Sequence, residues 1–362
     1  MKKIKKAVLT GGGRATRLRP LTHTINKHLL PLANKPMIFH AIEKVAEAGV
    51  EEIYINTNPG EDQLQKYIGD GGHWGLKIEF FEQEGGPQGI AHVVKCADKF
   101  IGDDPFLFYL SDNIILGSLK PFFEQFETHQ ADCMLAFSKV PDPERFGVPV
   151  FGDDGLLIDV VEKPVNPPNN FAQTGIYFYG PKVFFQAFSK IDKSHRGEYE
   201  ISSIHSYFLK NNFNVKYKEI TGWWKDTGKP EDLIAANRLL LDEIPADEFK
   251  NDGQVESGAI VSGKVRIGDG TSVGRNVKIT GPVIIGENCV LEDCVINPNT
   301  TIGVGCIIKK AEISNSILLA KCHIDCDHRI DGSIIGANVK IIKNGQNDFR
   351  RMILGDNTLI EI

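Results

Sequence analysis

The residues best suited to bind a phosphate chain lie between positions 11 and 27. An apolar run over 7–10 ends in three consecutive glycines, Gly11, Gly12 and Gly13. Consecutive glycines leave backbone N–H groups uncovered, so they can surround an anionic oxygen. Four cationic side chains follow: Arg14, Arg17, Arg19 and Lys27. Several cations suit a multiply charged phosphate better than a single carboxylate, although a solvated glycine turn with surface arginines is the alternative.

Spacing excludes two common phosphate-binding motifs from this segment. A P-loop ends in Gly-Lys-Ser/Thr, and residues 11–27 contain no Gly-Lys pair. The dinucleotide fingerprint G-x-G-x-x-G begins well at Gly11 and Gly13, but Thr16 occupies the position of its third glycine. If this segment binds phosphate, it does so with a different loop.

Two aspartates are candidates to hold a divalent cation beside the phosphates. Asp112 follows a buried apolar run, and Asp226 lies in the tryptophan-containing stretch 223–228. Carboxylate oxygens are the ligands that Mg²⁺ prefers, and two of them can hold it against phosphate oxygens. The alternative for each aspartate is a cap or turn residue, and the sequence leaves open whether the two meet.

The first part of the chain alternates strands with helices. A helical apolar face over 38–48 is closed by Gly49. A second helix is expected over 90–97, and strands over 53–55, 76–81 and 106–110. Such alternation predicts a parallel sheet covered on both faces. Ligands bind these sheets beyond the carboxyl ends of the strands, where the glycine loop and Asp112 are expected to lie.

The stretch 132–242 continues the same domain with more β-structure, because no linker-like composition interrupts it. Further helices are expected over 200–209 and 230–241, and further strands over 133–140, 156–162, 175–179 and 215–220. The resulting fold class is α/β, a Rossmann-like domain with a mixed, mostly parallel sheet.

Beyond Pro245 the sequence repeats every six residues. Aliphatic residues recur at Val255, Val261, Ile267, Val273, Ile279, Ile285 and Leu291, and a mostly small or β-branched residue follows each after four positions. This period fits no α-helix and predicts a left-handed parallel β-helix of hexapeptide repeats. The register slips at Ile296 and resumes at Ile302. The predicted domains are a catalytic domain over 1–245, the β-helix over 246–345 and a tail over 346–362.

Composition and charge limit the compartment in which the protein is expected to act and the partners that it is expected to bind. A net charge of −6 argues against a broad nucleic-acid surface. No apolar run approaches the ~20 residues that span a bilayer, so no membrane association is expected. The basic N-terminus has an apolar continuation too short for a signal peptide. Seven cysteines without an export signal suggest thiols in a reducing cytoplasm.

A series of short motifs extends along the chain. These motifs are Gly11 to Thr22, Lys27 to Pro31, Lys35-Pro36-Met37, Ser111-Asp112-Asn113, Glu162-Lys163-Pro164, Thr174 to Tyr177, Arg196-Gly197-Glu198, Trp224 to Leu233 and Ala236-Asn237-Arg238. Taken in order, they resemble the motifs of the sugar-1-phosphate nucleotidyltransferases, and of the long-form glucose-1-phosphate thymidylyltransferases in particular. That long form also carries a C-terminal β-helix, so the resemblance extends over essentially the whole chain.

The resemblance implies roles for particular residues. Arg17 would hold the β- and γ-phosphates, Lys27 the α-phosphate and Lys163 the sugar phosphate. Asp112 and Asp226 would bind Mg²⁺. Nucleotide-binding residues would be Leu9, Gly11, Gly12, Gly13, Gln83, Gly89 and Asp112. Sugar-phosphate-binding residues would be Glu162, Lys163, Thr174, Gly175 and Tyr177. The partners implied are a nucleoside triphosphate, a sugar 1-phosphate and further copies of the chain in a homo-oligomer.

The sequence departs from the family pattern on the nucleotide side. Ala15 stands where glycine is usual, His28 where glutamine is usual, and Gln88 where the short thymidylyltransferases carry aspartate. UTP therefore remains an alternative to dTTP. Two alternatives belong to other classes: a regulatory or scaffold subunit, and a β-helix acyltransferase.

The segment Cys322 to His328 also has cysteine and histidine spacings that zinc sites use. The alternative is a structural role, because cysteine is a favoured small residue on the faces of a β-helix. For the β-helix as a whole we expect a mainly structural or assembly role.

Overall fold

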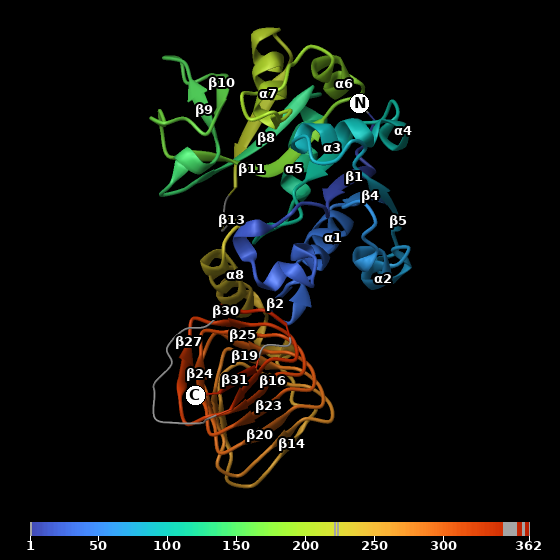
Figure 1. The fold of residues 1–362 in the computed structure, drawn as a ribbon. Helices are drawn as coiled ribbons and strands as arrows, with labels where there is room; N and C mark the ends of the chain where they lie inside the picture. The colour runs from blue at the N-terminus through green and yellow to red at the C-terminus, as the bar shows by residue number, and fades with distance from the viewer. Residues whose placement is uncertain (1, 221, 223, 343–352, 357–358, 362) are drawn as a thin grey trace. The chain divides into compact units, whose positions relative to one another are not determined.

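The computed structural model describes residues 2–220, 222, 224–342, 353–356 and 359–361 (Figure 1). By spatial proximity the chain forms two compact units. The first joins residues 1–13 to 38–226, and the second joins 14–37 to 227–362. The segment 14–37, which carries Arg17 and Lys27, is therefore grouped with the C-terminal part of the chain. The predicted domain boundary at 245 follows chain order, and it stays a proposal.

A seven-stranded sheet forms the centre of the first unit. Its strands, in spatial order, are β12 (Val215–Glu219), β8 (Cys133–Lys139), β11 (Phe171–Tyr179), β6 (Phe106–Tyr109), β1 (Lys6–Thr10), β4 (Glu52–Thr57) and β5 (Lys77–Glu82). Only β11 runs antiparallel to its neighbours β6 and β8, and the other pairings are parallel. The predicted mixed, mostly parallel sheet is confirmed.

Helices cover both faces of this sheet. On one face, α3 (Ile90–Cys96), α6 (Val183–Phe188) and α7 (Ile201–Lys210) pack on alternate residues of β6, β8 and β11 in a single apolar core. On the other face, α5 (Lys120–Thr128) packs three phenylalanines around Phe178, whose neighbours Tyr177 and Tyr179 point the opposite way. The remaining helices of this unit are α1 (Met37–Glu47), α2 (Gln63–Ile68), α4 (Asp98–Ile101), η4 (Gly72–Trp74) and η5 (Pro143–Arg145).

Two small antiparallel ribbons complete the first unit. The first pairs β7 (Asn113–Ile115) with β13 (Trp224–Asp226), and the second pairs β9 (Gly147–Phe151) with β10 (Leu157–Glu162). The β7–β13 ribbon joins two segments that are far apart in the chain.

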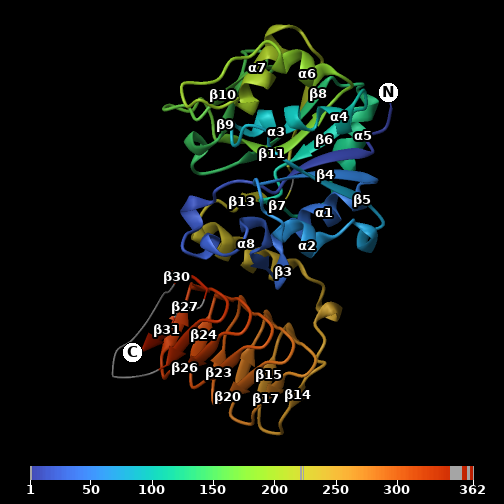
Figure 2. The same cartoon turned by 45° about the vertical axis from the view of Figure 1, so that its right-hand side comes forward.

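The second unit contains the predicted β-helix, whose stacked coils are visible in Figure 2. Its strands form three parallel sheets. The first sheet is β14 (Gln254–Val255), β17 (Ser272–Val273), β20 (Val290–Glu292), β23 (Ile307–Lys309), β26 (His323–Asp325), β29 (Lys340–Ile342) and β31 (Leu359–Glu361). The second is β15 (Ile260–Ser262), β18 (Lys278–Thr280), β21 (Val295–Ile296), β24 (Glu312–Ser314) and β27 (Arg329–Asp331). The third is β16 (Val265–Ile267), β19 (Val283–Ile285), β22 (Thr300–Ile302), β25 (Ile317–Leu318), β28 (Ile334–Ile335) and β30 (Ile353–Leu354).

The repeated aliphatic residues fill the interior of the β-helix, as the six-residue period predicts. Ile267, Ile279 and Leu291 are fully buried there. The slip at Ile296 is a shortened coil, because Ser272 pairs with Val290 eighteen positions later whereas Lys278 already pairs with Val295. Strands β30 and β31 continue the pairing into the predicted tail, of which residues 346–352, 357–358 and 362 lie outside the described residues.

The rest of the second unit consists of short elements and one longer helix. They are η1 (Thr16–Leu18), η2 (Leu21–His23), η3 (Lys27–Leu29), the hairpin β2 (Pro31–Leu32) and β3 (Lys35–Pro36), α8 (Pro230–Glu243) and η6 (Ala246–Glu248). Throughout the described part of the chain, no helix has the length and apolar character needed to cross a membrane.

Candidate active site

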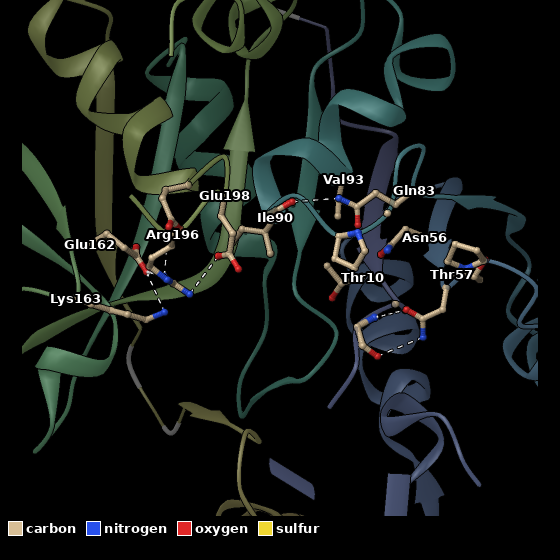
Figure 3. A pocket seen from close by; sticks show the side chains of 18 residues that line it. Thr10, Asn56, Thr57, Gln83, Ile90, Val93, Glu162, Lys163, Arg196 and Glu198 are labelled. Atoms are coloured by element: carbon tan, nitrogen blue, oxygen red, sulfur yellow. Dashed lines mark hydrogen bonds and ion pairs between the residues drawn. The ribbon is translucent and has the colours of Figure 1, made fainter. Parts of the chain in front are cut away.

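A cavity of about 270 Å³ lies at the carboxyl end of the central sheet, within the first unit (Figure 3). Residues that follow β1, β4 and β5 line one part of it, as expected for a parallel sheet. The lining residues are Thr10, Gly12, Gly13, Asn56 to Pro59, Gln83, Gly86, Pro87, Gly89, Ile90, Val93, Glu162, Lys163, Arg196, Glu198 and Glu200. Of the predicted site residues, Gly12, Gly13, Gln83, Gly89, Glu162 and Lys163 are among them.

Side chains at the end of β4 hold the glycine loop. Asn56 Oδ1 accepts a hydrogen bond from Gly11 N at 3.0 Å, and Asn58 Oδ1 accepts one from Gly13 N at 2.7 Å. A Cβ atom at Gly11 would lie 2.5 Å from Leu64 Cδ1, and Gly13 adopts a φ of 121°. The loop therefore requires glycine for two reasons, close packing at Gly11 and backbone conformation at Gly13. Neither asparagine belongs to a motif that predicts a site residue.

On the predicted base side, Gln83 is held by its neighbours. Its Nε2 lies 3.0 Å from His92 Nδ1 and 3.4 Å from the carbonyl oxygen of Gly89. Burial lowers the pKa of His92, so the neutral ring is favoured as an acceptor for this amide. Gly89 has a φ of 96°, and a Cβ atom there would lie 2.5 Å from Tyr199 O. This arrangement fixes the side-chain amide of Gln83 at the cavity wall.

Two cations and several carboxylates form the other wall of the cavity, as Figure 3 shows. Lys163 Nζ lies 3.5 Å from Glu162 Oε1. Arg196 forms ion pairs with Glu198 at 3.2 Å, with Glu200 at 3.3 Å and with Glu162 at 3.9 Å. Lys163 and Arg196 thus share Glu162, and both present positive charge to the cavity. Arg196 belongs to the motif Arg196-Gly197-Glu198, for which the family resemblance implies no specific role.

The β7–β13 ribbon brings the two predicted metal ligands to one region of the first unit. Asp226 pairs with Asn113, and Asp112 directly precedes that asparagine. Asn113 Nδ2 donates to Asp112 Oδ1 at 2.9 Å, while its Oδ1 accepts from Trp224 Nε1 at 2.7 Å. Both aspartates are half-buried. The sequence left open whether they meet, and the ribbon places them one residue apart in register.

Strand β11 contributes the predicted sugar-binding residues next to this ribbon. Gly175 N donates to Asn113 Oδ1 at 3.0 Å, and a Cβ atom at Gly175 would lie 2.7 Å from that side chain. Burial raises the pKa of Tyr177 well above its usual value, and the negative charges of Glu162, Asp112 and Asp226 raise it further. These three carboxylates therefore act on the same hydroxyl.

Two predicted contact residues lie within the packed interior. Thr174 is fully buried, and its hydroxyl donates to the carbonyl oxygen of Ala136 at 2.9 Å. Leu9 is fully buried in β1. Neither lines the cavity.

The predicted cations Arg17 and Lys27 belong to the second unit. Arg17 is exposed on η1, and Lys27 is half-buried at the start of η3. Asn26 caps η3 by accepting a hydrogen bond from His28 N at 2.8 Å. Ala15, where the family usually has glycine, adopts φ 43° and ψ 40°, a left-handed conformation that glycine reaches without cost.

The chemistry that these groups support is phosphate binding with charge neutralisation. The cavity combines a glycine loop, two cations and an amide that can read a base, and two carboxylates that suit a hard cation lie on the ribbon. Among the described residues, no group of three or more His, Cys, Asp or Glu side chains is arranged to hold a metal. The zinc-like spacing of Cys322 to His328 therefore gains no support from the geometry.

Comparisons with known proteins agree with this chemistry. The family described as Nucleotidyl transferase matches residues 6–243, and the family described as GMPPB C-terminal domain matches residues 279–361. The glucose-1-phosphate thymidylyltransferase of Streptomyces antibioticus is 36% identical over 359 residues, which cover 99% of each chain.

Two solved structures each resemble about two thirds of this chain. A Bacillus anthracis protein in complex with sucrose matches with a TM-score of 0.62 at 34% identity, covering 66% of this chain and 96% of that one. A UDP-glucose pyrophosphorylase complexed with UDP-glucose matches with a TM-score of 0.59 at 25% identity, covering 66% of this chain and 99% of that one.

Proposed function

Because the chain belongs to the nucleotidyl transferase family and is a sugar-1-phosphate nucleotidyltransferase, we propose that it transfers a nucleotidyl group from dTTP to glucose 1-phosphate. The products are the nucleoside diphosphate sugar and pyrophosphate. The observation that carries this choice of substrates is the end-to-end similarity to a named glucose-1-phosphate thymidylyltransferase, which includes the β-helix. We also propose that the enzyme is a homo-oligomer and acts in the cytoplasm. The seven cysteines are all present as thiols, which is compatible with a reducing compartment.

The proposed reaction is an in-line displacement at the α-phosphorus. A phosphate oxygen of the sugar 1-phosphate forms a bond to that phosphorus, the bond between the α-phosphorus and its bridging oxygen breaks, and pyrophosphate leaves with the electron pair. The attacking oxygen is already ionised at neutral pH, so no general base is required. Catalysis then depends on positioning and on neutralising the combined charge of two phosphate substrates.

Within the cavity, each wall suits one substrate. Gln83 and the backbone around Gly89 would bind the base. The glycine loop, whose Gly11 and Gly13 N–H groups are held by Asn56 and Asn58, would lie against the nucleotide. Lys163 would bind the sugar phosphate, and we add Arg196 to this role because it shares Glu162 with that lysine. Arg17 and Lys27 keep the roles that the family resemblance implies, with the leaving pyrophosphate and the α-phosphate respectively.

Asp112 and Asp226 would hold Mg²⁺, and their half-buried carboxylates on adjacent strands fit an oxygen-ligated cation. When bound, this ion would neutralise charge on the reacting phosphates. Asn113 would orient the Asp112 carboxylate through its 2.9 Å hydrogen bond.

UTP is the alternative nucleotide, and the structural likeness to a UDP-glucose pyrophosphorylase favours keeping it in the test. A scaffold subunit with a decayed site is disfavoured, because Arg17, Lys27, Asp112, Lys163 and Asp226 are all retained. For an acyltransferase in the β-helix, the histidine candidates are His323, which is half-buried, and His328, which is buried in the packed coils.

The deciding experiment measures pyrophosphate release with four nucleoside triphosphates against the 1-phosphates of glucose, galactose, mannose and N-acetylglucosamine. We expect the highest kcat/KM for dTTP with glucose 1-phosphate, and no release from either substrate alone. A higher kcat/KM with UTP would replace the nucleotide assignment. Absence of release in all sixteen pairs would overturn the proposed function.

A further inference from the structure

We infer that the β-helix positions the phosphate-binding segment 14–37 for nucleotidyl transfer, through Asn237 at one end and Asp356 at the other. The inference rests on the proposed function, because it assigns the segment's cations to the nucleotide. It assigns to the β-helix a part in the reaction beyond assembly. Asn237 and Asp356 are positioning residues, since neither is assigned a contact with substrate.

The first anchor is a buried hydrogen-bond network around Asn237 on α8. Its Oδ1 accepts from Ala33 N at 2.8 Å and from Thr301 Oγ1 at 3.3 Å. Its Nδ2 donates to the carbonyl oxygen of Asn299 at 3.4 Å. Asn237 is 1% exposed and Thr301 is fully buried. One amide therefore connects the tip of the β2–β3 hairpin to a coil of the β-helix, in a buried setting where an unpaired polar group is unfavourable.

The hairpin tip contacts the same coil a second time. Asn34 Nδ2 donates to the carbonyl oxygen of Ile302 at 2.7 Å. Both tip residues, Ala33 and Asn34, have positive φ values of 49° and 58°, which a two-residue hairpin turn requires. Apolar packing supports these bonds, because Ala33 forms one buried cluster with Leu241 of α8 and Ile284 of β19.

The face of the β-helix that makes these contacts is unusual in composition. In strands β19, β22 and β25 of its third sheet, the residues that point away from the interior are apolar or uncharged and buried, whereas Arg266 at the same position of β16 is half-buried. Ile284 is 3% exposed, Thr301 is fully buried and Ile317 is 2% exposed, and they pair in register. The second sheet has exposed charged residues at its outward positions, Lys278 and Arg329 among them. The third sheet is therefore adapted to be covered.

The second anchor lies at the C-terminal end of the same sheet, beyond β30. Asp356 Oδ2 accepts from Thr24 Oγ1 at 2.7 Å, and its Oδ1 accepts from Ala337 N at 2.8 Å. Gly355 packs on Pro20, since a Cβ atom there would lie 3.3 Å from that ring. Asp356 thus joins the end of η2 to the turn after β28.

Lys27 lies between the two anchored residues of the segment, three positions after Thr24 and six before Ala33. The segment around it forms only short elements, η1, η2, η3 and a hairpin of two-residue strands, which would be marginal alone. Fixing the segment on both sides of Lys27 removes conformational freedom before the nucleotide binds, and such preorganisation lowers the entropic cost of the reactive geometry.

The test uses full-length variants at both anchors. Asn237→Leu removes all three hydrogen bonds, whereas Asn237→Asp keeps the acceptor for Ala33 N. Thr24→Val preserves side-chain shape and removes the hydroxyl that donates to Asp356, together with its longer 3.5 Å contact with the carbonyl oxygen of Leu21. The matched control is Ser314→Ala, which removes a comparable 2.7 Å bond to Asp331 between two coils and touches no part of segment 14–37.

Two readouts separate positioning from general destabilisation. We expect Asn237→Leu and Thr24→Val to lower kcat/KM for the nucleoside triphosphate about tenfold, with KM for the sugar 1-phosphate within twofold of the unmodified protein. Amide hydrogen exchange over residues 25–36 should accelerate in both variants. Asn237→Asp should recover part of the loss, and Ser314→Ala should match the unmodified protein in both readouts.

Unchanged kinetics in Asn237→Leu and Thr24→Val, measured with an active unmodified protein, would overturn the inference and leave the proposed function standing. Equal losses for both substrates, or an equal loss in Ser314→Ala, would also overturn it, because a general structural effect would then account for the data. Should Asn237→Leu fail to fold, Thr24→Val at the other anchor provides the same kinetic and exchange readouts. An unmodified protein inactive with every substrate pair would overturn the proposed function itself.

Discussion

Asp226 lies directly opposite Asn113 in the antiparallel β7–β13 ribbon, and Asn113 in turn donates to the carboxylate of Asp112 at 2.9 Å. This pairing brings two aspartates from distant parts of the sequence close together, as the proposed cation site requires. Asn113 links the two aspartates, because it pairs with Asp226 in the ribbon and donates to Asp112. Its side-chain oxygen also accepts hydrogen bonds from Trp224 Nε1 and Gly175 N.

The two aspartates should be individually essential for turnover. Asp112→Asn and Asp226→Asn each remove a negative charge and keep the side-chain shape, so Mg²⁺-dependent pyrophosphate release should fall about 100-fold or more. Asp153→Asn is the control, since Asp153 lies exposed in the turn between β9 and β10. Turnover that is unchanged in either active-site variant would remove that aspartate from the metal site.

Asn56 should control nucleotide affinity through the backbone of the glycine loop. Asn56→Leu removes the acceptor that lies 3.0 Å from Gly11 N at a buried position. Leaving this N–H unpaired should destabilise the folded conformation of the glycine loop by about 1–3 kcal/mol. We expect KM for the nucleoside triphosphate to rise about tenfold and KM for the sugar 1-phosphate to stay constant. Steady-state kinetics with each substrate varied in turn provide the check, with Asn211→Leu on the surface after α7 as control. A change confined to the sugar KM would contradict the assignment.

His205 should make the first unit less stable in mild acid. It is fully buried on α7, its Nε2 lies 2.7 Å from Tyr179 Oη and its Nδ1 contacts Gln173, and burial lowers its pKa from near 6.5 to about 3. Below pH 6.5 the unfolded chain therefore binds a proton that the folded chain does not bind. The free energy of unfolding should then decrease as the pH falls from 6.5 towards 3, by about 1 kcal/mol per pH unit.

Urea unfolding followed by tryptophan fluorescence can measure this loss, because all three tryptophans lie between residues 74 and 224. His205→Gln should unfold with a shallower dependence on pH between 6.5 and 4.5 than the unmodified protein. Equal slopes for the two proteins would show that His205 is not the group that titrates.

The thiols should divide into one reactive and six protected groups. Cys96 is half-buried, whereas Cys133 and the five cysteines of the β-helix are at most 1% exposed. Burial also raises the pKa of several of them, that of Cys294 to about 12, so thiolate is scarce at neutral pH. A thiol reagent should modify one cysteine in the native protein and seven after unfolding, and none in native Cys96→Ser. Rapid native modification of more than one thiol would contradict the packing of the coils.

Much of the fold can be predicted from the sequence, because the residue patterns that indicate it are local and repeated. The period of six that begins at Val255 predicts the β-helix, since each coil buries the same positions as the last. Val255 and Val261 are exposed because the first coil has a neighbour on one side only. Helix α5 is an addition to the expected elements, although its three phenylalanines face Phe178.

The sequence by itself determined the family, and it proposed the glycine loop, both aspartates and Lys163 as site residues, because these are recorded as residue types at short spacings. Tertiary structure alone decided what surrounds them. Asn56, Arg196 and Asn237 come from segments far from the groups that they contact, and no local pattern encodes such pairings. The allocation of segment 14–37 to the unit of the β-helix has the same origin. It arises from buried hydrogen bonds and apolar packing between residues hundreds of positions apart, which form only when the chain has folded.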